Sequence, residues 1–65
     1  MNDEHKSYTA MASFNATLEG QISISTNDSL LLLNDENKLW WYVKNLNTDE
    51  VGYVPAEYVE VFIID

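Results

Sequence analysis

The sequence "LWWYVKN" (residues 39–45) places two tryptophans and a tyrosine side by side in a chain of 65 residues. Such a run, followed by the polar "NLNTDE", is typical of a β-strand that leads into a hairpin. Neighbouring residues of a strand face opposite sides of its sheet, so Trp40, Tyr42 and Lys44 share one face. Trp41 and Val43 share the other face, and Val43 is the natural core residue. The pattern therefore predicts Trp41 in the barrel wall near its rim and Trp40 on the outer face, where a tryptophan indicates a binding surface.

The flanking sequence predicts further short strands joined by turns. Ile22 and Ile24 alternate with serines, as a half-buried strand requires. Periodicity does not separate helix from strand in the leucine run 30–33, but its brevity and its stop at "NDENK" favour a strand. "PAEY" (55–58) suits one 3₁₀ turn before the last strand. Turns are expected at "LEGQ" and "TNDS", and five strands at residues 22–24, 30–33, 39–44, 51–54 and 59–63. Five short strands joined by turns are typical of a small all-β barrel or sandwich.

Alternation along these strands also predicts the core. The inward-facing residues are expected to be Ala10, Ile22, Ile24, Leu30, Leu32, Val43, Val54 and Val59. Asp28 lies in the turn "TNDS", where its side chain can accept hydrogen bonds from turn amides.

Composition restricts the class of protein. Sixty-five residues suffice for one small domain, and without cysteine the chain has neither disulfides nor thiolate metal sites. Eleven acidic residues against three lysines give a net charge of −8, which disfavours nucleic acid and anionic lipid and favours basic partners. The alternative is that the charge only keeps the domain soluble. We expect neither a membrane span nor a signal peptide, because the apolar runs are short and "MNDEHKS" is polar.

No catalytic or metal site is predicted. His5, the only histidine, lies in the polar segment 1–7, and no serine has a base at a suggestive position. "NDEN" (34–37) lacks the ligand pattern of a calcium loop. We therefore expect no enzymatic activity and no cofactor. We also expect a flexible N-terminal tail over residues 1–7, a domain over 8–63 and a C-terminal end at 64–65.

Three longer segments together resemble a Src homology 3 (SH3) domain over nearly the whole chain: "AMASFNATLEGQISIS" (10–25), "WWYV" (40–43) and "GYVPAEYVE" (52–60). The resemblance implies a five-stranded SH3-like barrel of two orthogonal sheets with one 3₁₀ turn. It also implies a monomeric module that binds basic, proline-rich segments of PxxP type. A polyproline II peptide is already extended and loses little entropy on binding, so its prolines fit shallow slots between parallel aromatic rings.

The resemblance assigns the groove residue by residue. Trp40 matches the tryptophan that separates the proline slots from the charge-reading pocket. Pro55 and Tyr58 match the residues that line the slots, and Phe14 matches the second aromatic of the family's "ALYDY" motif. Tyr53 falls on the aromatic that backs the pocket. Tyr58 also disfavours ubiquitin binding, which the family associates with phenylalanine at this position.

The family pattern is altered at four positions. Ala12 and Ser13 replace the first aromatic and the aspartate of "ALYDY", so the outer proline slot loses one wall. Gln21 replaces the acidic residue that usually pairs with a ligand cation. Glu57 replaces an asparagine that normally bonds a ligand carbonyl, and its charge is placed to meet a ligand arginine or lysine.

Three acids remain near the pocket. Glu19 lies within "LEGQ", in the loop that the family calls the RT loop, and Asp35 and Glu36 lie within "NDEN", in the loop that the family calls the n-Src loop. An exposed ion pair contributes only about 0–1 kcal/mol, so we expect weakened or altered PxxP recognition of micromolar or poorer affinity. Two alternatives stay open. In the first, the groove binds a non-PxxP peptide or a folded surface. In the second, the domain has a structural role within a larger scaffold.

The combination of "TLEGQIS", "WWYV" and "GYVPAEYVE" is similar to a subgroup of fungal SH3 scaffolds that act in cell polarity and recruit protein phosphatase 1. This similarity implies a larger cell-polarity or cytoskeletal scaffold in the cytoplasm, which reaches the cell cortex or cell tips through partners. Phosphatase recruitment would use segments outside this domain.

Overall fold

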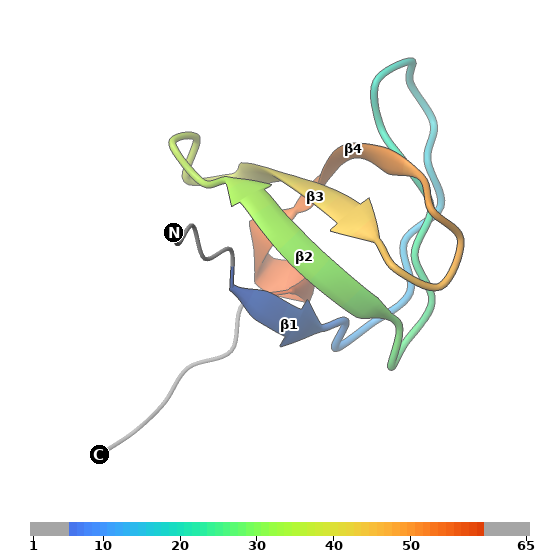
Figure 1. Ribbon diagram of the computed structural model, residues 1–65. Helices are drawn as coiled ribbons and strands as arrows, with labels where there is room; N and C mark the ends of the chain where they lie inside the picture. Colours follow the sequence, from blue (N-terminus) through green and yellow to red (C-terminus); the bar gives the residue numbers. More distant parts are fainter. Residues whose placement is uncertain (1–5, 60–65) are drawn as a thin grey trace.

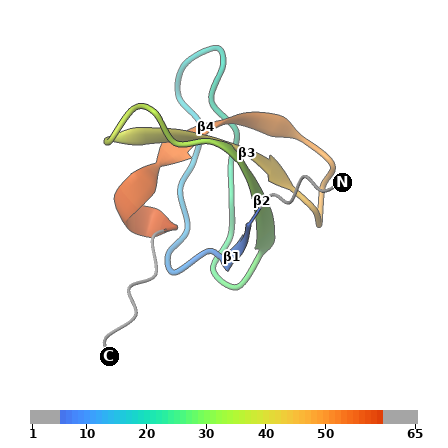
Figure 2. The same ribbon diagram turned by 60° about the vertical axis from the view of Figure 1, so that its left-hand side comes forward.

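The computed structural model describes residues 6–59 of the chain. In this part the elements follow as β1 (Ser7–Thr9), β2 (Ser29–Asn34), β3 (Trp40–Asn45), β4 (Val51–Pro55) and the 3₁₀ turn η1 (Ala56–Tyr58). The strands form one antiparallel sheet in the order β1-β2-β3-β4, so each strand pairs with its neighbour in sequence (Figure 1). Figure 2 shows the sheet strongly bent, with β4 across the top of the view and β1 below it. The predicted all-β fold with one 3₁₀ turn is confirmed.

The strands differ in detail from those expected. The three predicted at 30–33, 39–44 and 51–54 are present as β2, β3 and β4, each shifted or extended by one residue. The three-residue strand β1 is not among the predicted ones, and it begins one residue before the expected domain start. The strand expected at 59–63 lies outside the described residues apart from Val59, which follows η1 as a turn residue.

The segment 22–24 is not a continuous strand, and this prediction was wrong. Its alternation is present, because Ile22 and Ile24 are buried while Ser23 is exposed. However, only Ile24 of this segment forms a bridge, with Phe14, and the preceding Gln21 forms a separate bridge with Tyr53. Two separate single-residue contacts cannot extend into a hydrogen-bonded ladder.

The core contains every residue that alternation predicts, and also Ala56 of η1, which was not predicted. All eight expected residues are buried, and they form one cluster (Ala10, Ile22, Ile24, Leu30, Leu32, Val43, Val54 and Val59). Trp41 packs against this cluster and meets the ring of Tyr8 edge to face, with the ring centroids 5.5 Å apart. The expected structural position of Trp41 is confirmed, with Tyr8 of β1 as its companion.

The long connection from β1 to β2, residues 10–28, is named here the RT loop, and it projects from the sheet in Figures 1 and 2. Residues 20–22 of this loop are fixed to β4, since the N–H of Tyr53 donates to the Gly20 carbonyl (2.9 Å) and the N–H of Ile22 to the Tyr53 carbonyl (3.2 Å). Gly52 permits this approach, because a Cβ there would lie 2.7 Å from the Gly20 oxygen and 2.7 Å from Ile22 Cγ2.

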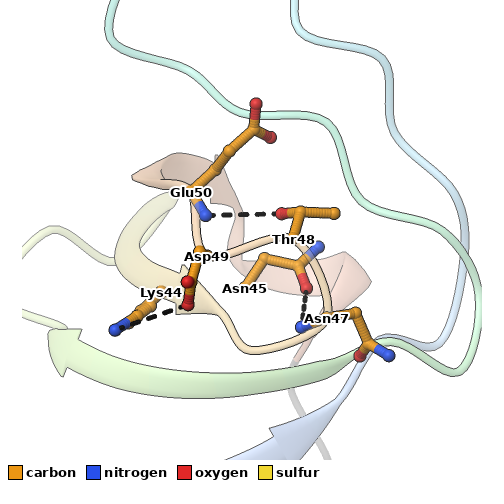
Figure 3. A network of polar contacts seen from close by, with 6 residues as sticks. All are labelled: Lys44, Asn45, Asn47, Thr48, Asp49 and Glu50. Carbon is orange, nitrogen blue, oxygen red and sulfur yellow. Dashed lines mark hydrogen bonds and ion pairs between the residues drawn. The ribbon is translucent and has the colours of Figure 1, made fainter.

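The other end of the RT loop is joined to the β3–β4 hairpin by a polar network. Asp28 Oδ2 accepts hydrogen bonds from the Ser25 N–H and from the side-chain amide of Asn45, each 2.9 Å long. The Ser25 bond and then the Asn45 bond hold the pKa of Asp28 below its ordinary value. Asn45 is fully buried, and its oxygen accepts from the Asn47 N–H (Figure 3). The expected role of Asp28 in satisfying turn amides is confirmed.

Within residues 6–59, the structure has no helix whose length and hydropathy would allow it to cross a membrane.

Candidate functional site

Three aromatic side chains from three different elements meet on the surface of the domain. Trp40 begins β3, Tyr58 ends η1, and Phe14 comes from the RT loop. The Phe14 ring lies 5.9 Å from Trp40 and 6.0 Å from Tyr58 between centroids, both in edge-to-face geometry. All three are half-buried, so each ring is held by its neighbours and still presents surface to solvent. Pro55, also half-buried, is the direct partner of Trp40 in the β3–β4 register.

Backbone hydrogen bonds fix the elements that carry these rings. Phe14 exchanges two bonds with Ile24, each 2.9 Å long. The N–H of Met11 donates to the Tyr58 carbonyl (2.7 Å), which ties η1 to the RT loop. The N–H of Ala56 donates to the Leu39 carbonyl (2.9 Å), which ties η1 to the start of β3. The spacing of the aromatic rings is therefore preorganised by the fold.

A pocket of about 290 Å³ opens on the other side of Trp40. It lies between the RT loop and the connection from β2 to β3, residues 35–39, which we name the n-Src loop. Residues 18–21 form one wall, and Asn37, Trp40 and Tyr53 complete the lining. Tyr53 is supported from behind by Tyr42, its partner across the strands, with ring centroids 4.9 Å apart. This volume lies at the lower end of small-ligand pockets and suits a single side chain.

Gln21 and Asn37 have their side-chain oxygens engaged inside this pocket. Gln21 Oε1 accepts from the N–H of Thr17 (2.9 Å), the hydroxyl of Thr17 (3.3 Å) and the N–H of Leu18 (3.1 Å). Asn37 Oδ1 accepts from the N–H groups of Leu39 (2.8 Å) and Trp40 (3.1 Å). Each carboxamide thereby holds the loop that carries it.

Of the acidic residues expected near the pocket, only one lines it. Glu19 lines it, whereas Asp35 and Glu36 are exposed in the n-Src loop and do not belong to the lining. Glu57 is exposed on η1 and is also outside the lining. The structure thus brings Glu19, Gln21, Trp40 and Tyr53 together in the pocket, with Phe14, Pro55 and Tyr58 on the far side of Trp40.

The altered "ALYDY" positions have structural partners of their own. Ser13 Oγ accepts a hydrogen bond from the Thr26 N–H (3.1 Å) and lies 3.3 Å from the Thr26 hydroxyl. Ala12 is half-buried and adds no aromatic surface. This segment therefore joins the first part of the RT loop to the turn at the end of the same loop.

The prediction of the site missed several residues. Leu18, Gly20 and Asn37 line the pocket but were not named, and Leu18 is 68% exposed there. "LEGQ" was recognised only as a turn, and an asparagine three residues before a strand is a signal for a side chain that bonds backbone amides. No group of three or more His, Cys, Asp or Glu side chains in the part of the chain described here is arranged to hold a metal ion.

Known proteins match this chain over most of its length. The sequence model of the variant SH3 domain matches residues 10–60. Tip elongation aberrant protein Tea4 of Schizosaccharomyces pombe is 45% identical over 51 residues, which are 78% of this chain and 6% of that protein. Bud site selection protein 14 of Saccharomyces cerevisiae is 33% identical over 60 residues, 92% of this chain and 8% of that protein. Tyrosine protein-kinase src-1 of Caenorhabditis elegans is 32% identical over 56 residues, 86% of this chain and 10% of that protein.

The chain spans at most a tenth of the length of these three relatives, so it corresponds to one module of each. Its bent antiparallel sheet, the 3₁₀ turn after "GYVP" and the aromatic cluster around Trp40 agree with the module that the sequence model describes. This chain belongs to the SH3 domain family.

Proposed function

We propose that this domain binds proline-rich segments of other proteins in the groove formed by Phe14, Trp40, Pro55 and Tyr58. SH3 domains are protein-interaction modules, and their ligands dock as polyproline II helices on aromatic surfaces. The observation that carries the proposal is the edge-to-face cluster in which Phe14 joins Trp40 at 5.9 Å and Tyr58 at 6.0 Å. Rings packed edge to face hold one another in place, and their solvent-facing surfaces suit the flat faces of proline rings.

The overall charge adds a preference for basic segments. The chain carries a net charge of −8, and its field attracts peptides that carry lysine or arginine beside the prolines. Glu19 at the pocket, and the exposed Asp35, Glu36 and Glu57 outside its lining, are the acids that flanking cations would approach.

The parent protein is proposed to be a scaffold in cell polarity or the cytoskeleton, located in the cytoplasm. Tea4 is named for tip elongation and Bud site selection protein 14 for bud site selection, and both are similar to this chain over three quarters of it or more. Recruitment to the cell cortex or cell tips through partners, and the link to protein phosphatase 1, belong to this part of the proposal.

A groove with a different ligand is the second candidate. It is favoured by Ala12, which supplies no ring for the outer slot, and by Ser13, whose hydroxyl is bonded to Thr26. On this alternative, the groove binds a non-PxxP peptide or a folded surface, or the domain has a purely structural role.

The test is a titration of ¹⁵N-labelled domain with a set of peptides. The set contains PxxP peptides with and without arginine, and sequences without proline. Binding of PxxP peptides is expected to shift the indole signal of Trp40 and the backbone amides of Phe14 and Tyr58, with micromolar or weaker affinity. If only proline-free sequences shift these signals, the second candidate is correct. If no peptide perturbs the groove, the peptide-binding proposal fails.

A further inference from the structure

The pocket beside Trp40 presents two side-chain amide groups from opposite loops. Gln21 comes from the RT loop and Asn37 from the n-Src loop, and both line the pocket. The Gln21 oxygen lies 2.9 Å from the Thr17 nitrogen and 3.1 Å from the Leu18 nitrogen. The Asn37 oxygen lies 2.8 Å from the Leu39 nitrogen and 3.1 Å from the Trp40 nitrogen.

These bonds fix the orientation of both carboxamides. A backbone N–H can only donate, so the atom of each side chain that it meets must be the oxygen. Rotating either amide by half a turn would place two N–H groups against backbone donors. The remaining end of each side chain is therefore an NH₂ group, which offers hydrogen atoms and carries no lone pair for a ligand donor.

The rest of the lining is apolar or aromatic, with one exception. Trp40 and Tyr53 offer ring faces and Leu18 an aliphatic side chain, and only Glu19 carries a charge. Glu19 is exposed, and an exposed ion pair strengthens binding by about fivefold at most. The two side-chain amides that backbone hydrogen bonds hold in place thus present donors, whereas a guanidinium or ammonium group requires acceptors.

We propose that this pocket binds an uncharged, hydrogen-bond-accepting side chain of the peptide, such as a carboxamide, in place of an arginine or lysine. The inference rests on the proposed function, because it names the residue that the same peptide places beyond Trp40. The aliphatic part of the side chain packs between Trp40 and Tyr53, and its carbonyl oxygen accepts from the amides of Gln21 and Asn37. Basic residues elsewhere in the peptide meet the exposed acids only through screened, long-range attraction.

The test compares arginine with citrulline, which has the same shape but carries a neutral urea group with a carbonyl oxygen. Peptides share one proline core and carry arginine, citrulline or glutamine at each position flanking that core. Dissociation constants are measured by tryptophan fluorescence and calorimetry at about 0.5 M salt, where the Debye length is only a few ångströms and the overall charge is screened. At the position that reaches the pocket, citrulline and glutamine are expected to bind about 2–10 times more tightly than arginine. Equal or tighter binding of arginine at every position overturns the proposal.

Substitutions of the carboxamides give an independent readout. Gln21→Glu keeps an oxygen that accepts from Thr17 and Leu18 and replaces only the NH₂ group with a second, charged oxygen. The preference should then reverse, with arginine favoured over citrulline by about tenfold or more. Asn37→Asp makes the same exchange on the opposite loop. It replaces Gln21→Glu as the test variant if Gln21→Glu does not fold.

The matched control is Asn47→Asp, in the turn at the opposite end of β3. Asn47 Oδ1 likewise accepts from a backbone N–H, that of Ser29 at 2.8 Å. The control variant therefore also gains one negative charge and keeps an oxygen that accepts from the backbone. It should leave the arginine-to-citrulline ratio unchanged. An unchanged ratio in both pocket variants, with binding intact, overturns the inference while the proposed function stands. Loss of binding for all peptides to the unmodified domain contradicts the proposed function itself.

Discussion

Adjacent tryptophans have different surroundings in this domain because a strand alternates its faces. Trp41 packs on the buried cluster and on Tyr8, whereas Trp40 contacts Phe14 in the proposed groove and lines the pocket. The two residues therefore make a matched pair for separating binding from stability.

Trp40→Lys is expected to weaken peptide binding by about 30-fold or more, because a central aromatic contact is lost. The free energy of unfolding should change by less than about 1 kcal/mol. Trp41→Lys should instead lower that free energy by roughly 2 kcal/mol or more, since it removes a ring packed on the core. Urea unfolding and peptide titration of both variants check this pair. Unfolding of the domain by Trp40→Lys would show that Trp40 belongs to the core.

Asp28 makes the stability of the domain depend on pH. Its pKa is lowered by the Ser25 N–H and then by the Asn45 amide, so the folded state favours the charged form. The stabilisation is complete above the ordinary pKa of 3.8 and is lost as the pH falls through the lower pKa of the folded state. Asp28→Asn should therefore have a lower free energy of unfolding than the unmodified domain at pH 7. The difference between the two free energies should shrink once the pH falls below 3.8.

Urea midpoints measured from pH 7 down to acid test this prediction. Asp35→Asn, in the exposed n-Src loop, is the control, because it removes the same charge without the two hydrogen bonds. A stability difference for Asp28→Asn that stays constant with pH would show that the carboxylate charge is not what the network stabilises.

At the scale of elements, the contact between β4 and residues 20–22 of the RT loop depends on Gly52. A methyl group at this position would lie 2.7 Å from the Gly20 carbonyl oxygen, which is backbone and cannot rotate away. Gly52→Ala is expected to lower the free energy of unfolding by about 1–3 kcal/mol, as overpacking does. It should also weaken peptide binding, because the displaced segment carries Gln21 and the wall of the pocket.

Chemical denaturation and peptide titration of Gly52→Ala measure both effects. Val51→Ala is the control, since Val51 is the neighbouring residue of β4 and is 42% exposed. It should change stability by about 0.5 kcal/mol or less. Equal effects of the two substitutions would contradict the role given to the glycine.

The elements also show how far the sequence predicts the fold. Period-two alternation is a local signal of burial, so it identified all eight residues of the buried cluster, whereas the strand at 30–33 was predicted from the shortness of the leucine run and its stop at "NDENK". Alternation does not report pairing partners, which explains why 22–24 was expected to be a strand and forms only bridges. β1 has three residues, which is too short for a pattern to be detected.

The candidate site was predictable to a similar extent. The aromatic positions were named from the family motif, whose residue types are distinctive. Asn37 and the fully buried Asn45 were missed because their roles depend on which backbone N–H groups the loops bring within reach. Loop geometry of this kind is set by tertiary contacts such as those of the RT loop with β4, not by local residue preference.

For the whole molecule, the net charge of −8 acts on the rate of association. Of the three lysines, Lys44 is already paired with Asp49 at 3.7 Å (Figure 3), so its charge is partly compensated. At about 0.01 M salt the Debye length is roughly 30 Å. This is close to the longest dimension of the domain, 33 Å, so its charges act on an approaching peptide together.

A basic proline-rich peptide should therefore associate about tenfold faster or more at 0.01 M salt than at about 0.5 M, while its dissociation rate changes little. Stopped-flow tryptophan fluorescence measures both rates. The same peptide with citrulline in place of every arginine is the control, and its association rate should be nearly independent of salt. A similar salt dependence for both peptides would show that the field of the domain does not steer association. If salt instead acts mainly on the dissociation rate of the basic peptide, its cations are held by direct contacts in the complex, as they would be in a pocket that reads arginine.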